Sequence, residues 1–437
     1  MRPNRCVSAA LPLLAGSLLL TSCNSYEMFR LAGYEQASFS NDADIVFIID
    51  NSPSMEEEAT ALAQNFQVFI DTLTTEGALP EGSSSDAVDA YIQYTSARGA
   101  YLDYGLSVTT TSVEDPGGTP PGVAGALVGD PSVVEDTDED VAGAFQRNLL
   151  CEATCWNEAT LPNDFELTCP EDGSAPETPE FISKEYLDCL CGGIDAWTDH
   201  CGSGNEEPLE AAFEATCRAV DPETAPDECV GGESALESAD INTSNFLRPD
   251  STVIFVVVTD EGDFSRRLSI GDEDPSTYLG LMDRFGARYR FAIIGPNPDT
   301  CQGGASQGVE RLQAMAEETE GFYRVIAEPG AGGDCEVADF ATYLEDLGAL
   351  LNQLLLSFPL QSVPDVATLL VYVDGEQIRI ATDADYADGE DEPSCDCWEY
   401  DASENAIRFY GSAVPDYGDD VDIFYKPLEG QPRTLPF

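Results

Sequence analysis

Three oxygen-bearing side chains follow one short apolar run near the start of the chain. Residues 44–54 read D-I-V-F-I-I-D-N-S-P-S, so that Asp50, Ser52 and Ser54 occupy alternate positions. One carboxylate and two hydroxyls form an all-oxygen donor set, which suits hard cations such as Mg²⁺, Mn²⁺ or Ca²⁺. The same residues also fit a polar turn in which Ser52 or Ser54 caps the next helix.

The apolar run that precedes these donors predicts a strand. Ile45–Ile49 is short and rich in β-branched residues, which is typical of a strand buried on both faces of a parallel sheet. Open α/β sheets bind ligands at the carboxyl ends of their strands. A second buried strand is predicted at Ser251–Asp260, and it again ends on an aspartate, Asp260.

Other segments alternate between strand-like and helix-like patterns. Helices are predicted at Met55–Leu73, Pro208–Arg218, Val309–Thr319 and Phe340–Leu355, and strands at Tyr104–Thr111, Arg290–Gly295 and Phe322–Ile326. Strands that alternate with helices predict an α/β fold with a doubly wound, mostly parallel sheet.

The motif and the order of elements together resemble those of a known family. Asp-x-Ser-x-Ser after a buried strand is similar to the metal-ion-dependent adhesion site of von Willebrand factor type A (vWA) domains, which are Rossmann-like. The resemblance covers residues 44–357 and implies that Asp260, in V-V-V-T-D-E-G-D, is a second metal-site residue. It also implies a divalent cation, with Mg²⁺ favoured over Mn²⁺ or Ca²⁺, and a partner protein whose exposed carboxylate completes the coordination.

The third metal-site element of that family departs from the expected pattern. The family has a threonine in a Gly-rich loop that opens a helix, whereas Gly202–Glu207 precedes Pro208 without any threonine. Ser203 could supply the hydroxyl, or Glu206 could supply a carboxylate instead. Thr109–Thr111, at the end of another predicted strand, offer a further possibility.

The N-terminus is typical of an exported protein. Arg2 and Arg5 precede an apolar stretch, Ala9–Leu20, which is too short to span a bilayer as a helix. Leu20-Thr21-Ser22-Cys23 resembles a bacterial lipobox, which implies a signal peptide at 1–22, a lipid on Cys23 and a tether at 23–43. Asn24 follows this cysteine in place of the aspartate that often marks inner-membrane retention, which favours the outer membrane as the location of the protein. The lipid would then be the only membrane anchor.

The cysteines support export to an oxidising compartment. Of 14 cysteines, Cys6 lies in the signal peptide and Cys23 would carry lipid. The other twelve are disulfide candidates: Cys151, Cys155, Cys169, Cys189, Cys191, Cys201, Cys217, Cys229, Cys301, Cys335, Cys395 and Cys397. Zinc binding is the alternative interpretation, although His200 is the single histidine and no pair of CxxC motifs occurs.

Two further regions complete the predicted organisation. A cysteine-rich insertion at about 113–201 should form a disulfide-stapled cap beside the metal face, or alternatively a lateral decoration. Residues 358–437 predict a small β-sandwich-like module, because Asp374-Gly375 between Leu369–Val373 and Gln377–Ile380 is a hairpin signal. Its further strands are predicted at Trp398–Tyr400, Ala406–Tyr410 and Val421–Tyr425.

Charge and motif content narrow the function. Acidic residues number 82 against 19 basic ones, giving a net charge of −63, which argues against nucleic-acid binding. No Walker motif occurs and the single histidine, His200, lies in a cysteine-rich segment, so we expect a binding protein rather than an enzyme. The alternatives are a structural envelope protein with a vestigial metal site, or a metal-dependent hydrolase using Glu261 or Glu206 as base.

Overall fold

The computed structural model describes most of the region after the predicted tether, with gaps. The described residues are 35–39, 42–74, 103–113, 123–163, 165–170, 176, 178–198, 200–202, 206–219, 227–230, 251–267, 274–285, 288–297, 308–330, 335–344, 346–347, 357–360, 362–386, 393–402, 405–415 and 421–428. The predicted signal peptide, Cys23, Ser203 and Cys301 lie outside them.

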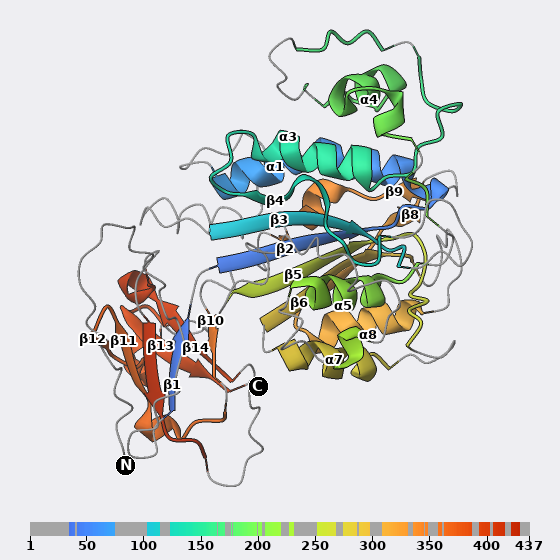
Figure 1. The fold of residues 1–437 in the computed structure, drawn as a ribbon. Helices are drawn as coiled ribbons and strands as arrows, with labels where there is room; N and C mark the ends of the chain where they lie inside the picture. Colours follow the sequence, from blue (N-terminus) through green and yellow to red (C-terminus); the bar gives the residue numbers. More distant parts are fainter. Residues whose placement is uncertain are drawn as a thin grey trace, which may run out of the picture.

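A six-stranded sheet forms the centre of the larger part of the molecule (Figure 1). Its strands are, in spatial order, β4 (Val128–Glu135), β3 (Asp103–Thr110), β2 (Asp42–Ile49), β5 (Thr252–Val258), β6 (Arg288–Gly295) and β7 (Phe322–Val325). All neighbouring pairs are parallel except β3 and β4, which are antiparallel. The predicted mostly parallel sheet is therefore confirmed.

The central strands are buried on both faces, as their composition predicts. Along β2, Ile45, Phe47 and Ile49 point into one apolar core, whereas Val46 and Ile48 point into another. Two sets of helices cover these cores (Figure 1): α1 (Glu56–Thr74) and α3 (Val141–Arg147) on one face, and α5 (Pro208–Ala219), α7 (Ser276–Met282) and α8 (Val309–Glu318) on the other.

Remaining elements are short. They are α4 (Lys184–Cys191), α6 (Asp227–Val230), the hairpin β8 (Ala327–Pro329) and β9 (Cys335–Val337), and the single turns η1 (Pro53–Met55), η2 (Asn148–Glu152), η3 (Ile194–Ala196), η4 (Asp283–Phe285), η5 (Val366–Thr368), η6 (Asp383–Asp385) and η7 (Gly411–Ala413). Of the helix predicted at Phe340–Leu355, residues 340–344 and 346–347 are helical, and 345 and 348–355 lie outside the described part.

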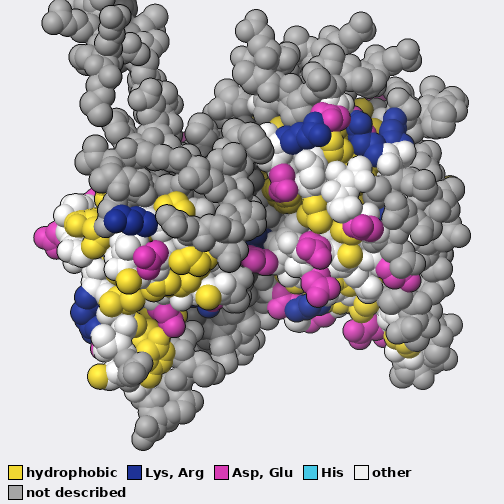
Figure 2. All heavy atoms as spheres, turned by 90° about the horizontal axis from the view of Figure 1, so that it is seen from below, with side chains coloured by type: hydrophobic (Ala, Val, Ile, Leu, Met, Phe, Trp, Pro, Cys, Tyr) yellow, Lys and Arg dark blue, Asp and Glu magenta, His cyan; other side chains and the backbone are white. Residues whose placement is uncertain are grey.

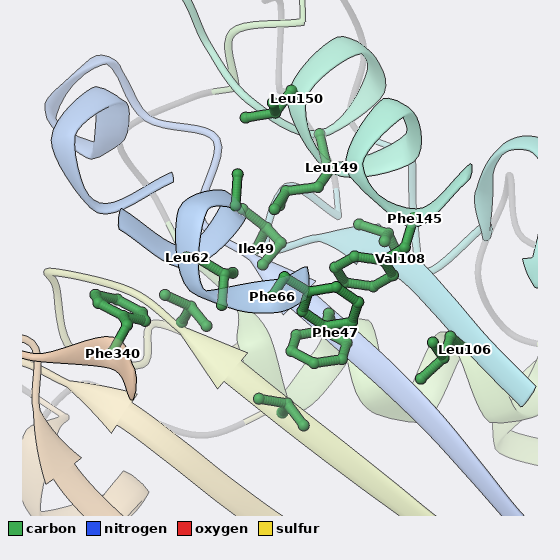
Figure 3. Packing of buried hydrophobic residues seen from close by; sticks show 14 of the residues in the cluster. Phe47, Ile49, Leu62, Phe66, Leu106, Val108, Phe145, Leu149, Leu150 and Phe340 are labelled. Atoms are coloured by element: carbon green, nitrogen blue, oxygen red, sulfur yellow. The ribbon is translucent and has the colours of Figure 1, made fainter. Parts of the chain in front are cut away.

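Part of the predicted insertion belongs to the main fold. Strand β4 extends the central sheet, and α3 packs on α1 through Phe145, whose ring lies 4.8 Å from that of Phe47 (Figure 3). Figure 3 shows Phe66 of α1 in the same cluster. This corrects the prediction that 113–201 forms a cap or a lateral decoration throughout, because residues 128–147 supply an edge strand and a core helix.

Disulfides connect the rest of the insertion and also occur in later parts of the chain. Within the described residues the pairs are Cys151–Cys191, Cys155–Cys201, Cys169–Cys189, Cys217–Cys229 and Cys395–Cys397, and Cys335 is disulfide-bonded as well. Paired cysteines in these numbers indicate a protein that folds in an oxidising compartment. They also leave these cysteines no thiolate for the zinc alternative.

The C-terminal module consists of two antiparallel sheets. One has the order β1 (Glu35–Phe39), β15 (Val421–Tyr425), β11 (Leu370–Val373), β12 (Glu376–Ile378), and the other β10 (Ser357–Pro359), β14 (Ala406–Tyr410), β13 (Cys397–Asp401). The hairpin turn has positive φ at both Asp374 (50°) and Gly375 (76°), as a primed turn requires.

Strand β1 comes from the predicted tether, which is a second correction. Ala37 lies opposite Ile423 in the antiparallel ladder between β1 and β15. A five-residue strand carries too little pattern to be recognised, and its partner lies almost the whole chain away. Since β2 begins at Asp42, the module lies at the amino ends of the central strands, away from their carboxyl ends (Figure 1).

Acidic and basic side chains lie close together on the described surface. On the face shown in Figure 2, Lys and Arg side chains occur in small groups beside Asp and Glu. Several arginines have specific carboxylate partners, such as Arg379 with Asp385 at 2.8 Å and Arg324 with Asp346 at 2.7 Å. Among the described helices, none combines the length and apolar character that a membrane span needs.

Candidate metal centre

Asp50 lies where the chain leaves the central sheet. Its main-chain N–H donates to the Val258 carbonyl (2.9 Å), so the β2–β5 ladder continues to this residue. The carboxylate is fully buried. Its Oδ1 accepts from the Ser52 N–H (2.8 Å) and its Oδ2 from the Thr259 hydroxyl (2.8 Å), which fixes its orientation.

The sheet brings Asp260 to the same place. After β2 the chain passes to β3 on one side, and β5 later joins β2 on the other side. Strand order reverses between β2 and β5, which is the position at the carboxyl edge where open α/β sheets bind ligands. Asp50 follows β2 and Asp260 follows β5, so both lie at this switch point.

The four predicted ligands of the motif form one connected chain. The Ser52 and Ser54 hydroxyls lie 3.0 Å apart, and Ser54 Oγ donates to Asp260 Oδ1 at 3.2 Å. Ser52 occupies the N-cap position of η1, but its side chain makes no capping hydrogen bond. Ser52 and Asp260 are buried while Ser54 is exposed, so the site opens to solvent at Ser54.

Of the two loop candidates for the third ligand, Glu206 lies within the described residues and Ser203 lies outside them. The Glu206 side chain is fully buried, and neither carboxylate oxygen has a partner in hydrogen-bond geometry, although the side chain of Glu261 is a close neighbour. The Glu206 carbonyl accepts from the Phe264 N–H (2.8 Å) in the loop that carries Asp260. The next residue, Glu207, instead pairs with Arg266 at 2.9 Å.

The threonines at the end of β3 were the remaining candidates for the third metal-site element. The Thr109 hydroxyl donates to the Ala126 carbonyl (2.8 Å), and the Thr110 hydroxyl is buried without a hydrogen-bond partner. The main chain of Thr111 bonds to Ile49 (3.0 Å) and Glu207 (3.0 Å) and so connects β3 to the loops around the site.

Buried negative charge dominates the electrostatics of this region. Burial, followed by the charge of Asp260, raises the pKa of Asp50 to about 7. Burial, followed by the charge of Asp50, raises the pKa of Glu206 to about 10. Burial also raises the pKa of Glu58 to about 7, with smaller contributions from Asp260 and Asp50. A cation would relieve this mutual repulsion.

The donor set fits a hard cation such as Mg²⁺, Mn²⁺ or Ca²⁺ rather than a softer metal such as Zn²⁺ or Cu²⁺. Within the described part of the chain, no three His, Cys, Asp or Glu side chains converge closely enough to hold a metal by themselves. A site here therefore depends on hydroxyl oxygens as well as carboxylates. Asp50, Ser52, Ser54 and Asp260 would supply these oxygens, and the unpartnered Glu206 carboxylate has free lone pairs to join them.

Sequence reasoning missed three residues that surround these donors. Thr259 orients Asp50, Glu58 adds a buried carboxylate from the first turn of α1, and Asn51 bonds to the insertion through the His200 carbonyl (2.7 Å). Thr259 directly precedes Asp260, and this adjacency could have identified it from the sequence as a residue near the site. Nothing in the run Glu56–Glu58 marks which glutamate turns inward.

Fold and site together define a doubly wound α/β domain with a carboxylate-rich, oxygen-only site at its topological switch point. No family model and no curated protein matches the chain. Among solved structures, it is similar to the pilus adhesin SpaC from Lactobacillus rhamnosus GG in an open conformation, with TM-score 0.30 and 11% identity over 90% of this chain. It is also similar to the pilus adhesin RrgA from Streptococcus pneumoniae, with TM-score 0.28 and 10% identity over 92% of this chain.

The chain spans only part of these structures, 40% of SpaC and 60% of RrgA. At such TM-scores we draw no conclusion about function from the likeness.

Proposed function

We propose that this chain is a vWA-like protein that binds a divalent cation, and through it a protein partner, at the bacterial cell envelope. The observation that carries the proposal is the meeting of Asp50, Ser52, Ser54 and Asp260 at the switch point, next to the unpartnered carboxylate of Glu206. The opening at Ser54 gives a partner access to the donors.

The partner ligand we propose is an exposed carboxylate of another protein. A bound cation, Mg²⁺ in the first instance, would supply a directional, charge-assisted contact to that carboxylate. The chain has a net charge of −63, so it would otherwise repel an acidic partner. A cation at the candidate site would reverse the sign of the local electrostatic field.

A binding role fits the site better than catalysis. Of the two candidate bases, Glu206 is fully enclosed and cannot reach a substrate, which leaves Glu261, half-buried, as the base that the hydrolase alternative requires. For the cellular location we propose a lipid on Cys23 as the membrane anchor, with the outer membrane favoured.

Cation binding is tested by calorimetric titration of the oxidised protein with Mg²⁺, Mn²⁺ and Ca²⁺. We expect the wild type to bind and Asp50→Asn to lose binding. Asp44→Asn is the matched control, because Asp44 is equally buried on β2 but lies six residues away, about 20 Å along the strand. At a hundredfold excess over the dissociation constant, the cation should stabilise the wild type by about 2.7 kcal/mol.

Each other outcome points to a different function. Binding by neither the wild type nor the control would favour a structural envelope protein with a vestigial site. Equal binding by all three proteins would assign the cation to the acidic surface. Turnover of a phosphate or ester substrate that depends on both the cation and Asp50 would support the hydrolase alternative.

A further inference from the structure

Asn51 stands between two proposed ligands, Asp50 and Ser52, yet its own polar atoms point to other parts of the chain. Its side-chain amide donates to the His200 carbonyl (2.7 Å), and its side-chain oxygen accepts from the Ser112 hydroxyl (2.7 Å). Its main-chain carbonyl accepts from the Gly202 N–H (2.9 Å). Three hydrogen bonds therefore hold a residue that no ligand role explains.

The segment that meets Asn51 is packed against it without spare room. A Cβ at Gly202 would lie 1.9 Å from Ser112 Oγ and 2.4 Å from Asn51 Oδ1. A larger residue at this position would therefore displace the Ser112 and Asn51 side chains from their present hydrogen bond. The contact is thus a fitted one, between the end of the insertion and the loop that carries Asp50, Ser52 and Ser54.

A disulfide anchors this segment to the core of the domain. Cys201 lies between His200 and Gly202 and pairs with Cys155, which is buried. On either side of Cys155, Ala153 and Trp156 pack in the same apolar core as Ile49, the residue just before Asp50. A covalent path therefore runs from the core through Cys155 and Cys201 to the residue between the proposed ligands.

A second contact joins the insertion to the start of α1. The Glu56 carboxylate accepts from the Asn157 N–H and from the Thr160 hydroxyl (3.3 Å). The Asp50–Ser54 loop is thus tied to the insertion both within the loop, at Asn51, and just after it, at Glu56.

We propose that Asn51, together with the Cys155–Cys201 disulfide, positions the ligand loop, so that the cation affinity of the site depends on this staple in the insertion. The inference rests on the proposed cation binding and adds a structural role for the insertion in that binding. Neither Asn51 nor the disulfide would touch the cation. They would hold Asp50 and Ser52 in the binding geometry before the cation arrives, which is how supporting residues raise metal affinity.

The test measures cation affinity by calorimetric titration with Mg²⁺ and Ca²⁺. It compares the full oxidised chain with two test variants, their combination and one control variant. Cys155→Ser/Cys201→Ser and Asn51→Ala should each weaken binding about ten- to hundredfold. Their combination should weaken it no further than the stronger of the two, because both act through one contact. Cys217→Ser/Cys229→Ser, which opens a disulfide at α5 and α6, should stay within about twofold of the wild type.

Asn51→Ala keeps every disulfide and covers the case in which the cysteine variant does not fold. Wild-type affinity in folded Asn51→Ala would overturn the inference while leaving the proposed function standing. Additive losses would overturn it as well, since they would show two independent effects. A wild type that binds no cation would overturn both this inference and the proposed function.

Discussion

Glu206 is the residue at which this site departs most from the motif that predicts it. The sequence left Ser203, Glu206 and Thr109–Thr111 as alternatives for the third ligand. We favour Glu206, because a buried carboxylate without a hydrogen-bond partner is tolerated only if it is neutralised by a proton or a cation. Nothing in a single sequence reports burial of this kind.

The raised pKa of Glu206 predicts how stability depends on pH. Its ordinary pKa is 4.5 and its folded pKa is about 10, so between these values the folded state holds a proton that the unfolded state has lost. The stabilisation that this proton gives the folded state is complete below pH 4.5. As the pH rises from 4.5 toward 10, the free energy of unfolding falls by about 1.4 kcal/mol per pH unit for one proton. Glu206→Gln should remove that part of the slope.

Urea unfolding in a chelator at pH 6 and pH 8 measures this difference. The wild type should lose more stability between the two pH values than Glu206→Gln does, and saturating cation should reduce the loss in the wild type. Equal losses in the two proteins without cation would show that Glu206 does not hold the proton. Asp50→Asn gives a comparison for the same pair of pH values. The pKa of Asp50 is raised only to about 7, so the contribution of Asp50 to the pH dependence of stability ends near pH 7.

At the scale of elements, predictability follows the strength of the local pattern. Strands β2 and β5 are continuous apolar runs, and their burial on both faces makes them recognisable. Asp50 directly follows β2 and Asp260 lies two residues beyond β5, so the rule for parallel sheets predicted that these two carboxylates lie at the same edge of the sheet. Strand β4 was missed because Gly129 and Pro131 interrupt its pattern, and at an edge it needs little apolar sequence.

Helix α3 was hidden in the insertion for a related reason. It has seven residues, too few for a helical period to stand out. Only its contact with Phe47 and Phe66 shows that it belongs to the domain core.

This assignment of α3 to the core can be tested by mutation. Phe145→Ala should destabilise the protein by about 3–5 kcal/mol, because Phe145 is fully buried between α1 and the sheet. Phe181→Ala is the control from the same insertion, since Phe181 is 44% exposed and should change stability by about 0.5 kcal/mol at most. Urea unfolding gives both values, and similar small losses would make α3 a decoration rather than part of the core.

At the scale of the whole molecule, the chain visits the C-terminal module twice. Strand β1 enters it before the central sheet begins, and β10–β15 complete it after the sheet ends. The sequence predicted the module from its hairpin and short strands but not the contribution of β1. Long-range strand pairing of this kind leaves no local signal.

Two proline substitutions test whether β1 supports the module. In an antiparallel pair, the N–H groups of successive residues face alternately toward and away from the partner strand. Of Gln36→Pro and Ala37→Pro, one therefore removes a hydrogen bond to β15, and the other should be tolerated because β1 is an edge strand. Amide exchange in Val421–Tyr425 should accelerate in the disruptive variant alone. Unchanged exchange in both would remove β1 from the module.

The position of β2 has a mechanical consequence. It runs for eight residues, about 26 Å, from the end at which the module lies to the cation site, and it is paired with β3 and β5 on either side. A pull between a partner held at Asp50 and an anchor at the N-terminal end would act along this strand. Both ladders would then be loaded in shear, with their hydrogen bonds sharing the force, instead of being opened one bond at a time.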